Sequence, residues 1–325
     1  MTNNRQPTWR RLSRVSFLVP LLLLVIAVGV NLFLQPSLFQ TRVLSGNLRV
    51  FLPLILLAAS QAIIVLGGGI DLSSGAIVSM VNTVLVSSFA AQAGEGNMAL
   101  ALLYGLGAGL LAGAFNGIGV AFLRLQPIVT TYASSFVFGG IALWVLPRPG
   151  GQVPQPLVAL YRSAPLGFPF PLLVIVALIL AWIALRSTRF GAYLFATGGA
   201  PRAAYTTGVP VDWIRFSTYA LGGVLAGFSA IALTLSTTTG DPNIGGARMT
   251  LDSIVAVVLG GTALSGGQGG LAGSVIGVLI LGIIRNIISF GGVSTWSETL
   301  VDALIILAAL TAPGLVRLVR GKFFS

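Results

Sequence analysis

The chain has 325 residues, of which 55% are hydrophobic and only 8% are charged, and its mean hydropathy is +0.97. Soluble domains carry about 25% charged residues, so this composition excludes them and predicts one all-α, polytopic membrane domain over residues 1–325. Because the chain has no Cys, no His and only seven acidic residues, it lacks the groups for disulfides, thiol or imidazole catalysis and His or Cys metal sites, which disfavours an enzyme.

The net charge of +11 would favour nucleic-acid binding in a soluble chain. Here the basic residues flank apolar runs, so we interpret them as topology signals and as contacts with anionic lipid headgroups. We therefore expect membrane lipid, and no nucleic acid, among the partners.

Apolar segments recur from end to end and predict ten transmembrane helices. They cover residues 17–34, 50–67, 74–92, 98–123, 128–146, 170–186, 214–236, 251–265, 271–290 and 298–316. With this layout, twelve of the 18 basic residues fall on the side of the two termini, five fall on the other side and Arg285 lies within a span. The excess predicts cytoplasmic tails over residues 1–16 and 317–325 and a cytoplasmic loop over residues 187–213.

The N-terminus combines several arginines with an apolar run, which is also typical of a signal peptide. The apolar run is longer than the core of a signal peptide and no A-x-A site follows it directly, so we interpret it as an uncleaved first span. Arg10-Arg11 as an export signal is the alternative.

The stretch VLGGGIDLSSGAI (65–77) predicts a break between two spans. Its three consecutive glycines (67–69) must end one helix, and Asp71 and Ser73 are suited to cap the next. A direct part in substrate passage is the alternative, so Asp71 and Ser73 are candidate pathway residues. No Gly-Lys-Ser/Thr follows, which excludes a phosphate-binding loop.

Glycines four residues apart in the span at 98–123 predict a groove along one helix face, into which another helix can pack closely. They are Gly105, Gly109, Gly113 and Gly117, and shorter versions are Gly223/Gly227 and Gly273/Gly277. Three further polar residues on spans are candidates to line a pathway, namely Asn116, Thr130 and Thr131.

Residues 186–215 interrupt the apolar runs with four arginines and Asp212. A central Arg costs at least about 2.5–3.5 kcal/mol in hydrocarbon, so this loop is predicted on the cytoplasmic side. Pro201 suits the first position of a short helix, Gly208 would end it and Pro210 would prevent its resumption. Such a loop is either an ordered surface connection or a docking point for another subunit.

The segment Leu264–Gln268, LSGGQ, is similar to the signature of ATP-binding cassette ATPases. No phosphate-binding Lys loop accompanies it and it lies between two spans, so we interpret it as a short inner turn.

Arg285 is a charge within a span, and Asp302 lies at a similar depth in the next span. Helices joined by a short loop are usually neighbours, so the two are expected to pair. Snorkelling of Arg285 and contact of Arg285 and Asn286 with substrate hydroxyls are the alternatives. Asp252, near the end of its span, is a further candidate for the pathway.

A shift of 192 residues suggests a direct internal repeat. It aligns Gly68 with Gly260, Gly69 with Gly261, Leu72 with Leu264, Ser73 with Ser265 and Gly75 with Gly267. An inverted repeat of helices 2–5 and 7–10, a common transporter plan, is the alternative.

Five segments, in series along most of the chain, carry a resemblance that is more specific than any one glycine motif. They are GGGIDLSSG (67–75), AFNGIGVAFLRLQPIVTTYA (114–133), RFGAYLFATGGAPRAAYTTGV (189–209), LDSIVAVVLGGTALSGGQGGLAGSVIG (251–277) and LGIIRNIISFGGVSTW (281–296). Together they resemble the permease subunit of sugar-importing ATP-binding cassette transporters of the ribose and xylose type.

The resemblance implies a vitamin-importer-like (type II importer) fold in the bacterial inner membrane. It also implies a second permease subunit, identical or not, a sugar-type ATPase subunit that holds ATP and Mg²⁺, and a periplasmic sugar-binding protein, with no cofactor on this chain. In this family the loop like residues 189–209 docks on the ATPase. The positions that carry over are Gly191, Ala196, Gly198, Ala203, Ala204 and Gly208, with Arg202 and Tyr205 on the same short helix.

Two positions depart from the family pattern. The family commonly has Asn where this chain has Ala200, and Ala there forgoes about 1 kcal/mol of helix capping. Ser74 stands where Val is usual.

The sequence thus predicts a permease that imports a monosaccharide, with nucleosides or branched-chain amino acids as alternative cargo. An ion-coupled secondary transporter is a rival, although Asp71, Asp252 and Asp302 all lie near span ends rather than inside them.

Overall fold

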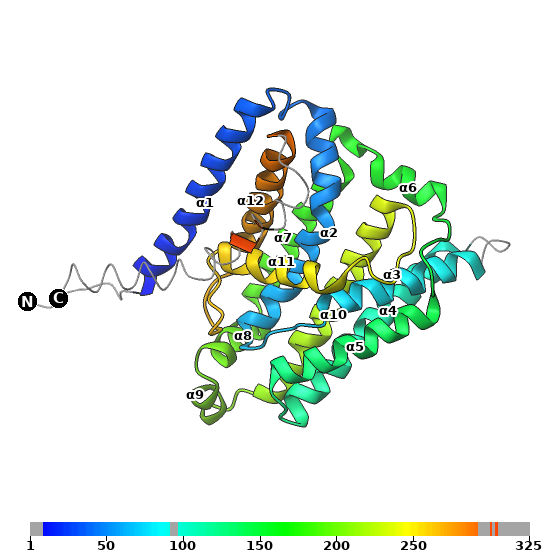
Figure 1. Cartoon of the computed structure of the whole chain (residues 1–325). Coiled ribbons are helices and arrows are strands. Elements are labelled where there is room, and N and C mark those ends of the chain that lie inside the picture. The colour runs from blue at the N-terminus through cyan, green and yellow to red at the C-terminus, as the bar shows by residue number, and fades with distance from the viewer. Residues whose placement is uncertain (1–8, 92–96, 292–299, 301–302, 305–325) are drawn as a thin grey trace, which may run out of the picture.

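The computed structural model describes residues 9–91, 97–291, 300, 303 and 304, and the regular elements in these ranges are all helices (Figure 1). The long helices are α1 (Trp9–Leu34), α2 (Thr41–Leu66), α3 (Ser74–Ala91), α4 (Met98–Gly117), α5 (Pro127–Val145), α7 (Phe170–Ser187), α10 (Val211–Thr237) and α12 (Leu271–Phe290). The shorter ones are α6 (Gln155–Arg162), α8 (Arg189–Gly199), α9 (Pro201–Thr206) and α11 (Gly246–Leu259), and a π-helical turn, Ile118–Phe122, prolongs α4.

Among the described residues, seven helices are long and apolar enough to cross a membrane, which confirms a polytopic all-helical protein. They are α2, α3, α4 with its π-helical turn, α5, α7, α10 and α12. α1 contributes a further apolar stretch, Val19–Leu34. The expected tenth span, 298–316, lies outside the described residues except for Leu300, Ala303 and Leu304.

The expected span at 251–265 is wrong in both position and length. The helix there is α11, which has 14 residues and ends at Leu259. At 1.5 Å per residue it is about 21 Å long, well short of the roughly 30 Å of a hydrocarbon core. Gly261 stops it, because its φ of 83° is left-handed and turns the chain away from the helix axis.

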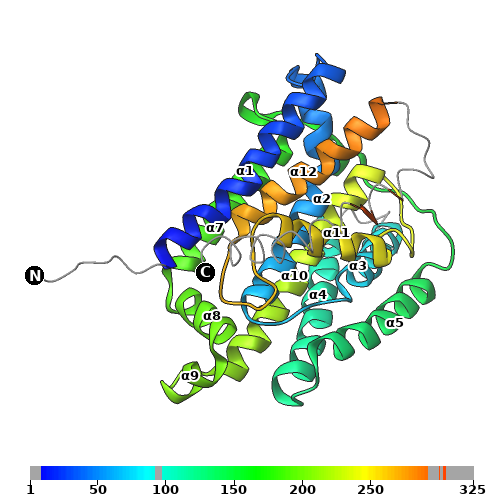
Figure 2. The same cartoon turned by 60° about the vertical axis from the view of Figure 1, so that its left-hand side comes forward.

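The central helix is α2, in which nearly every residue from Leu52 to Leu66 is buried. It packs against α7, α8, α10, α11 and α12, whereas α1 lies outside, alongside α12 (Figures 1 and 2). Pro53 lies within α2 and has no N–H to donate, so the carbonyl of Arg49 loses its helical partner. The Tyr161 hydroxyl of α6 donates to that carbonyl at 2.7 Å.

The glycine face of α4 packs so closely against α10 that the backbones of the two helices are in contact. A Cβ on Gly109 would lie 2.6 Å from the Gly223 oxygen, and a Cβ on Gly113 would lie 2.3 Å from the Tyr219 oxygen. The other two glycines face side chains, because Gly105 lies against Leu85 of α3 and Gly117 against Phe216 of α10. At Gly109 and Gly113 only glycine leaves room for the backbone of the neighbouring helix.

A buried amide on α3 holds the connection between α10 and α11. Asn82 Nδ2 donates to Thr234 Oγ1 at 2.7 Å and to the Thr239 oxygen at 3.2 Å, and its Oδ1 accepts from the Asp241 N–H at 2.7 Å. Asn82 is fully buried, and nothing in its local sequence marks it. The α10–α11 connection is thereby fixed to α3 rather than left as a free loop.

The packing argues against the direct repeat aligned by a shift of 192. α10 packs on α3 and α4 as α2 packs on α11 and α12, so the contacts match α2 with α10, α3 with α11 and α4 with α12, the correspondence that the inverted-repeat alternative assumes. In a direct repeat the pair α2–α3 would match α11–α12, yet α2 barely touches α3 while α11 packs along α12. The similar glycine-rich segments that suggested a direct repeat are explained by similar helix ends. The same three backbone hydrogen bonds end α2 at Gly67–Gly69 and α11 at Gly260–Thr262. The two sets of bonds are related by a shift of 193 residues rather than 192.

Candidate functional site

The segment 188–210 folds as two short helices at one extremity of the molecule, where α9 projects from the bundle (Figures 1 and 2). The Thr188 hydroxyl caps α8 by accepting from the Gly191 N–H at 3.3 Å. Pro201 begins α9, and Gly208, with a φ of 83°, ends it two residues before Pro210. The short helix expected from the sequence is confirmed. α8 is an additional helix, which makes the segment a helical hairpin.

The α8–α9 hairpin divides the expected coupling residues into a buried and an exposed set. Buried are Gly191, Gly198 and Ala204; exposed are Ala196, Arg202, Ala203, Tyr205 and Gly208. Ala204 belongs to a small apolar cluster with Val209, Val211 and Ile214, which fixes α9 to the start of α10. Tyr205 is 72% exposed and contributes an aromatic ring to the same free surface as Arg202.

Ala200 precedes Pro201 without any side-chain cap, and α9 has only six residues. Capping therefore does not hold α9 in place, and its position depends on the apolar contacts of Ala204. A short helix held by one side and exposed on the other is suited to contact another subunit.

The glycine-rich break between α2 and α3 leads into a buried hydrogen-bonded group, here called the Asp71 cluster. Asp71 Oδ1 accepts from the Ser73 N–H at 2.7 Å and from its hydroxyl at 2.6 Å, and Asn116 Nδ2 donates to Ser73 Oγ at 2.7 Å. Thr131 Oγ1 accepts from the Leu72 N–H at 3.0 Å. The structure thus brings four of the predicted pathway residues together, from the break, α4 and α5.

Two members of the Asp71 cluster were missed by the sequence reasoning. The Tyr219 hydroxyl of α10 donates to the Ile70 oxygen at 3.3 Å. The Gln61 amide of α2, oriented to satisfy both groups, pairs with the N–H and the oxygen of Asp71 at 3.2 and 3.1 Å. Both lie in apolar helices and carry no local signal. The cluster therefore ties the break to α2, α4, α5 and α10.

Among the described residues, Asn116 Oδ1 in this cluster and Ser74 Oγ, next to Ser73, are buried without a hydrogen-bond partner. A buried polar atom without a partner costs about 1–3 kcal/mol, so native structures hold few of them. The Asn116 oxygen could accept a hydrogen bond from a polar ligand, and the Ser74 hydroxyl could donate or accept one.

The remaining pathway candidates lie elsewhere. Arg285 on α12 pairs with Asp252 on α11, with 2.8 Å between Arg285 Nη2 and Asp252 Oδ2. Asp302, the partner expected from the sequence, lies outside the described residues. Asn286 follows Arg285 and has a buried Nδ2 without a partner in the described chain. Thr130 turns away from Thr131, with its hydroxyl donating to the Gln126 oxygen at 3.0 Å.

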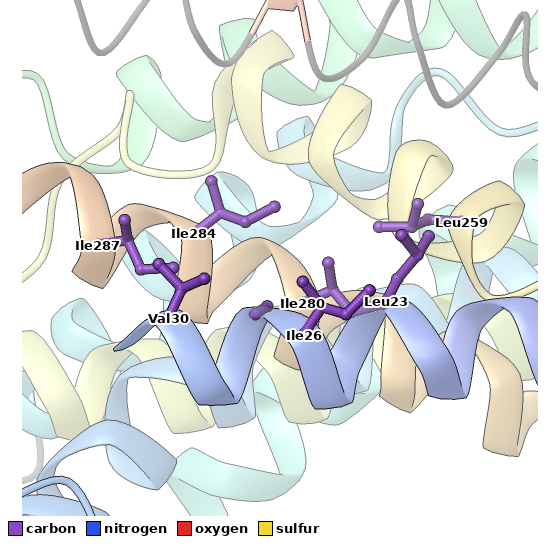
Figure 3. A pocket seen from close by; sticks show the side chains of 8 residues that line it. Leu23, Ile26, Val30, Leu259, Ile280, Ile284 and Ile287 are labelled. Carbon is purple, nitrogen blue, oxygen red and sulfur yellow. The ribbon is translucent and has the colours of Figure 1, made fainter. Parts of the chain in front are cut away.

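A groove of about 280 Å³ lies between α1, α11 and α12 (Figure 3). Its lining consists of aliphatic side chains alone: Leu23, Ile26, Ala27, Val30, Leu259, Ile280, Ile284 and Ile287. It offers no hydrogen bond to a polar ligand, so it suits an apolar occupant rather than a sugar. The described residues also contain no group of three or more His, Cys, Asp or Glu side chains that could hold a metal ion.

The chain is similar to a family of membrane transport proteins and to several of its members. The family described as "Branched-chain amino acid transport system / permease component" matches residues 43–310. The ribose import permease protein of Bacillus subtilis is 32% identical over 295 residues, 90% of each chain, and its Escherichia coli K12 counterpart is 30% identical over 89% of this chain and 91% of its own. The galactofuranose transporter permease protein of E. coli K12 is 34% identical over 79% of this chain and 75% of its own. No solved structure matches the chain.

Proposed function

Because this chain belongs to the family of branched-chain amino acid transport system permease components, we propose that it is the membrane subunit of an ATP-binding cassette importer for a monosaccharide. The cargo class is supported by the relatives, whose names specify ribose and galactofuranose. In this proposal the chain catalyses no reaction and holds no cofactor. A partner ATPase subunit binds ATP and Mg²⁺, a periplasmic sugar-binding protein delivers the cargo, and a second permease subunit completes the translocation path.

The observation that carries the proposal is the α8–α9 hairpin. It projects from the bundle, exposes Arg202 and Tyr205, and is fixed at its base to α10 by Ala204 (Figures 1 and 2). A surface of this kind lets a separate motor act on the bundle, which would alternate between openings to the two sides of the membrane.

The proposal includes a topology. Ten membrane segments, among them α11, which is too short to cross as a helix by itself, would leave both termini and the loop 187–213 in the cytoplasm of a bacterial inner membrane, where an ATPase can reach the hairpin. The seven described spans and the excess of arginine on that side support this arrangement. The whole chain then forms one transmembrane domain with cytoplasmic tails over residues 1–16 and 317–325.

We place the cargo path between two polar groups. One is the Asp71 cluster, with Asp71, Ser73, Asn116 and Thr131, and the other is the pair of Asp252 and Arg285 with Asn286. The buried polar atoms without a partner at Asn116, Ser74 and Asn286 support this choice. Both threonines donate within their own helix, but Thr131 also accepts from the Leu72 N–H, so we keep Thr131 and leave out Thr130.

Ion-coupled transport by this chain alone is less well supported. Coupling to an ion needs a carboxylate that gains and loses a charge during the cycle. Asp71 is held by Ser73 and Asp252 by Arg285, so the described carboxylates inside the bundle already have partners. Transport by the purified chain in liposomes, driven by an ion gradient without ATP, would revive this rival.

The test of the proposed function is a charge reversal on α9. In liposomes containing the permease, its ATPase and its binding protein, Arg202→Glu should reduce cargo-stimulated ATP hydrolysis by roughly tenfold, within the usual range of coupling between sites. Membrane insertion should be unchanged, because Arg202 is exposed. The matched control is Arg148→Glu, at another exposed arginine in the loop after α5, and this variant should hydrolyse ATP as the wild type does.

Unaltered cargo-stimulated hydrolysis in Arg202→Glu would refute docking through α9. A binding screen with the delivery protein against pentoses, hexoses, nucleosides and branched-chain amino acids decides the cargo class. Binding of leucine or of a nucleoside, without binding of any sugar, would refute the monosaccharide and leave the importer in place.

A further inference from the structure

Three backbone segments, far apart in the sequence, meet where α8 ends. They are the end of α8 at Gly198 and Gly199, the end of α2 at Leu66–Gly68, and the connection from α11 to α12 at Gly266 and Gly267. The Gly267 N–H donates to the Leu66 oxygen at 3.1 Å. We call this contact the glycine junction, and its α8 and α2 parts lie side by side in Figures 1 and 2.

The junction has no room for a side chain. A Cβ on Gly198 would lie 1.8 Å from the Leu66 oxygen and 2.7 Å from the Gly267 nitrogen. A Cβ on Gly267 would lie 2.4 Å from the Gly199 Cα, and one on Gly266 would lie 2.8 Å from the Gly198 oxygen. Gly266 and Gly267 also have left-handed φ angles of 83° and 68°, which other residues rarely adopt.

Contact between backbones transmits displacement differently from contact between side chains. A packed side chain can change rotamer and absorb part of a shift, whereas a backbone in van der Waals contact moves its neighbour or separates from it. Next to the junction, α10 also contacts the end of α2, because Gly67 lies against Leu194 of α8 and Thr218 of α10. A displaced α8 therefore displaces the central helix α2 and the α11–α12 connection together.

We propose that the glycine junction transmits motion of the α8–α9 hairpin to α2 and to the α11–α12 connection, with Gly198, Gly266 and Gly267 as positioning residues. This inference rests on the proposed function, because it assumes that an ATPase moves the hairpin. It also gives a role to the segment 264–268, whose LSGGQ sequence supplies two glycines of the junction rather than a nucleotide contact.

The test substitutes alanine at the junction and measures coupling. Gly198→Ala is informative because alanine favours a helix by about 1 kcal/mol over glycine, so α8 itself is not weakened. In Gly267→Ala, which lies outside the α8–α9 hairpin, we expect the amount of co-purified ATPase and basal hydrolysis to match the wild type. In both variants cargo-stimulated hydrolysis and transport should each fall by roughly tenfold, within the range of coupling free energies.

Two control variants distinguish the effect of a side chain in the junction from the effect of replacing a glycine elsewhere. Gly139 lies in a helix, as Gly198 does, and Gly167 has a left-handed φ of 80°, as Gly267 does, but a Cβ at either control meets no atom within 4 Å. Gly139→Ala and Gly167→Ala should couple as the wild type does. Wild-type coupling in both junction variants would overturn the inference.

A distance measurement keeps the inference testable if the variants assemble poorly. The chain has no native Cys, so spin labels can be placed on single introduced cysteines without background. In the wild-type complex, the distance between labels at Ala192 of α8 and Ser265 should stay constant between nucleotide-free and ATP-bound states. The reference pair, Ala192 and Gln126 at the start of α5, should change; all three label positions are exposed.

A junction pair that changes as much as the reference pair, or a reference pair that does not change, would overturn the inference. A wild-type chain that neither binds an ATPase nor stimulates one would overturn the proposed function instead, so the two failures are distinguishable.

Discussion

Tyr161 supplies the hydrogen bond that Pro53 removes from the central helix. Its hydroxyl lies 2.7 Å from the Arg49 oxygen, and the side chain is 1% exposed. Burial raises the pKa of Tyr161, which the charge of Arg49 offsets only in part, so the phenol keeps its proton and remains a donor. One side chain on α6 therefore both closes the helical gap and fixes the loop between α5 and α7 to the bundle.

We expect Tyr161→Phe to lower the stability of the purified chain by about 1–2 kcal/mol, because it removes the hydrogen bond to the part-buried Arg49 carbonyl while keeping the ring. The measurement is the thermal midpoint in detergent by size-exclusion chromatography after heating. Tyr104→Phe is the matched control, since Tyr104 is half exposed on α4. Equal midpoints for the two variants would mean that the hydroxyl contributes nothing.

For Arg285, the need for an acidic partner can be predicted from the sequence, but the identity of that partner cannot. Its depth within an apolar span predicts an acidic partner. The sequence predicted Asp302, which lies outside the described residues, and it did not predict the contact with Asp252 on α11. The faces that meet are set by the packing of α11 on α12, and packing between helices has no signature in the local sequence.

At the scale of elements, the crossing of α4 and α10 depends on glycine at its contact points. Gly113 lies where a Cβ would come within 2.3 Å of the Tyr219 oxygen and 2.8 Å of the Gly223 Cα. Gly107, on the same helix, faces open space. The two positions differ in what they contact, and not in helix propensity.

Gly113→Ala should therefore destabilise the chain by about 1–3 kcal/mol through overpacking, as in tightly packed cores. Gly107→Ala should leave stability unchanged or raise it, because alanine is the better helix former. Thermal midpoints of the two variants, measured side by side in one detergent, test this difference. If Gly113→Ala proves as stable as Gly107→Ala, the helices do not cross as described.

Element boundaries were predictable where glycine and proline mark them and unpredictable where they do not. Pro201 and Gly208 correctly bounded α9. The apolar run at 251–265 hid the end of α11, because hydropathy does not register the left-handed backbone at Gly261. At the Asp71 cluster, Asp71, Ser73, Asn116 and Thr131 were found by their polarity, whereas Gln61 and Tyr219 join it only through the approach of α2 and α10.

At the scale of the whole molecule, we predict that the tenth span expected at 298–316, which lies largely outside the described residues, packs into the groove between α1, α11 and α12. The connection from Phe290 to residue 298 is short, so the next helix should lie beside α12. Residues 303–310 read ALIILAAL, which matches the aliphatic lining of the groove (Figure 3). Burying this lining against a helix stabilises the fold through packing, which is the main force between helices in lipid.

Cross-linking tests this placement, again without background cysteines. Paired with Ile280→Cys in the groove, single cysteines introduced from Leu304 to Leu310 should cross-link with a period of three to four residues, as one face of a helix requires. The same series paired with Leu111→Cys, exposed on α4, should not cross-link. Absence of cross-links along the whole series would refute this placement of the tenth span, and the groove would then face lipid or another subunit instead.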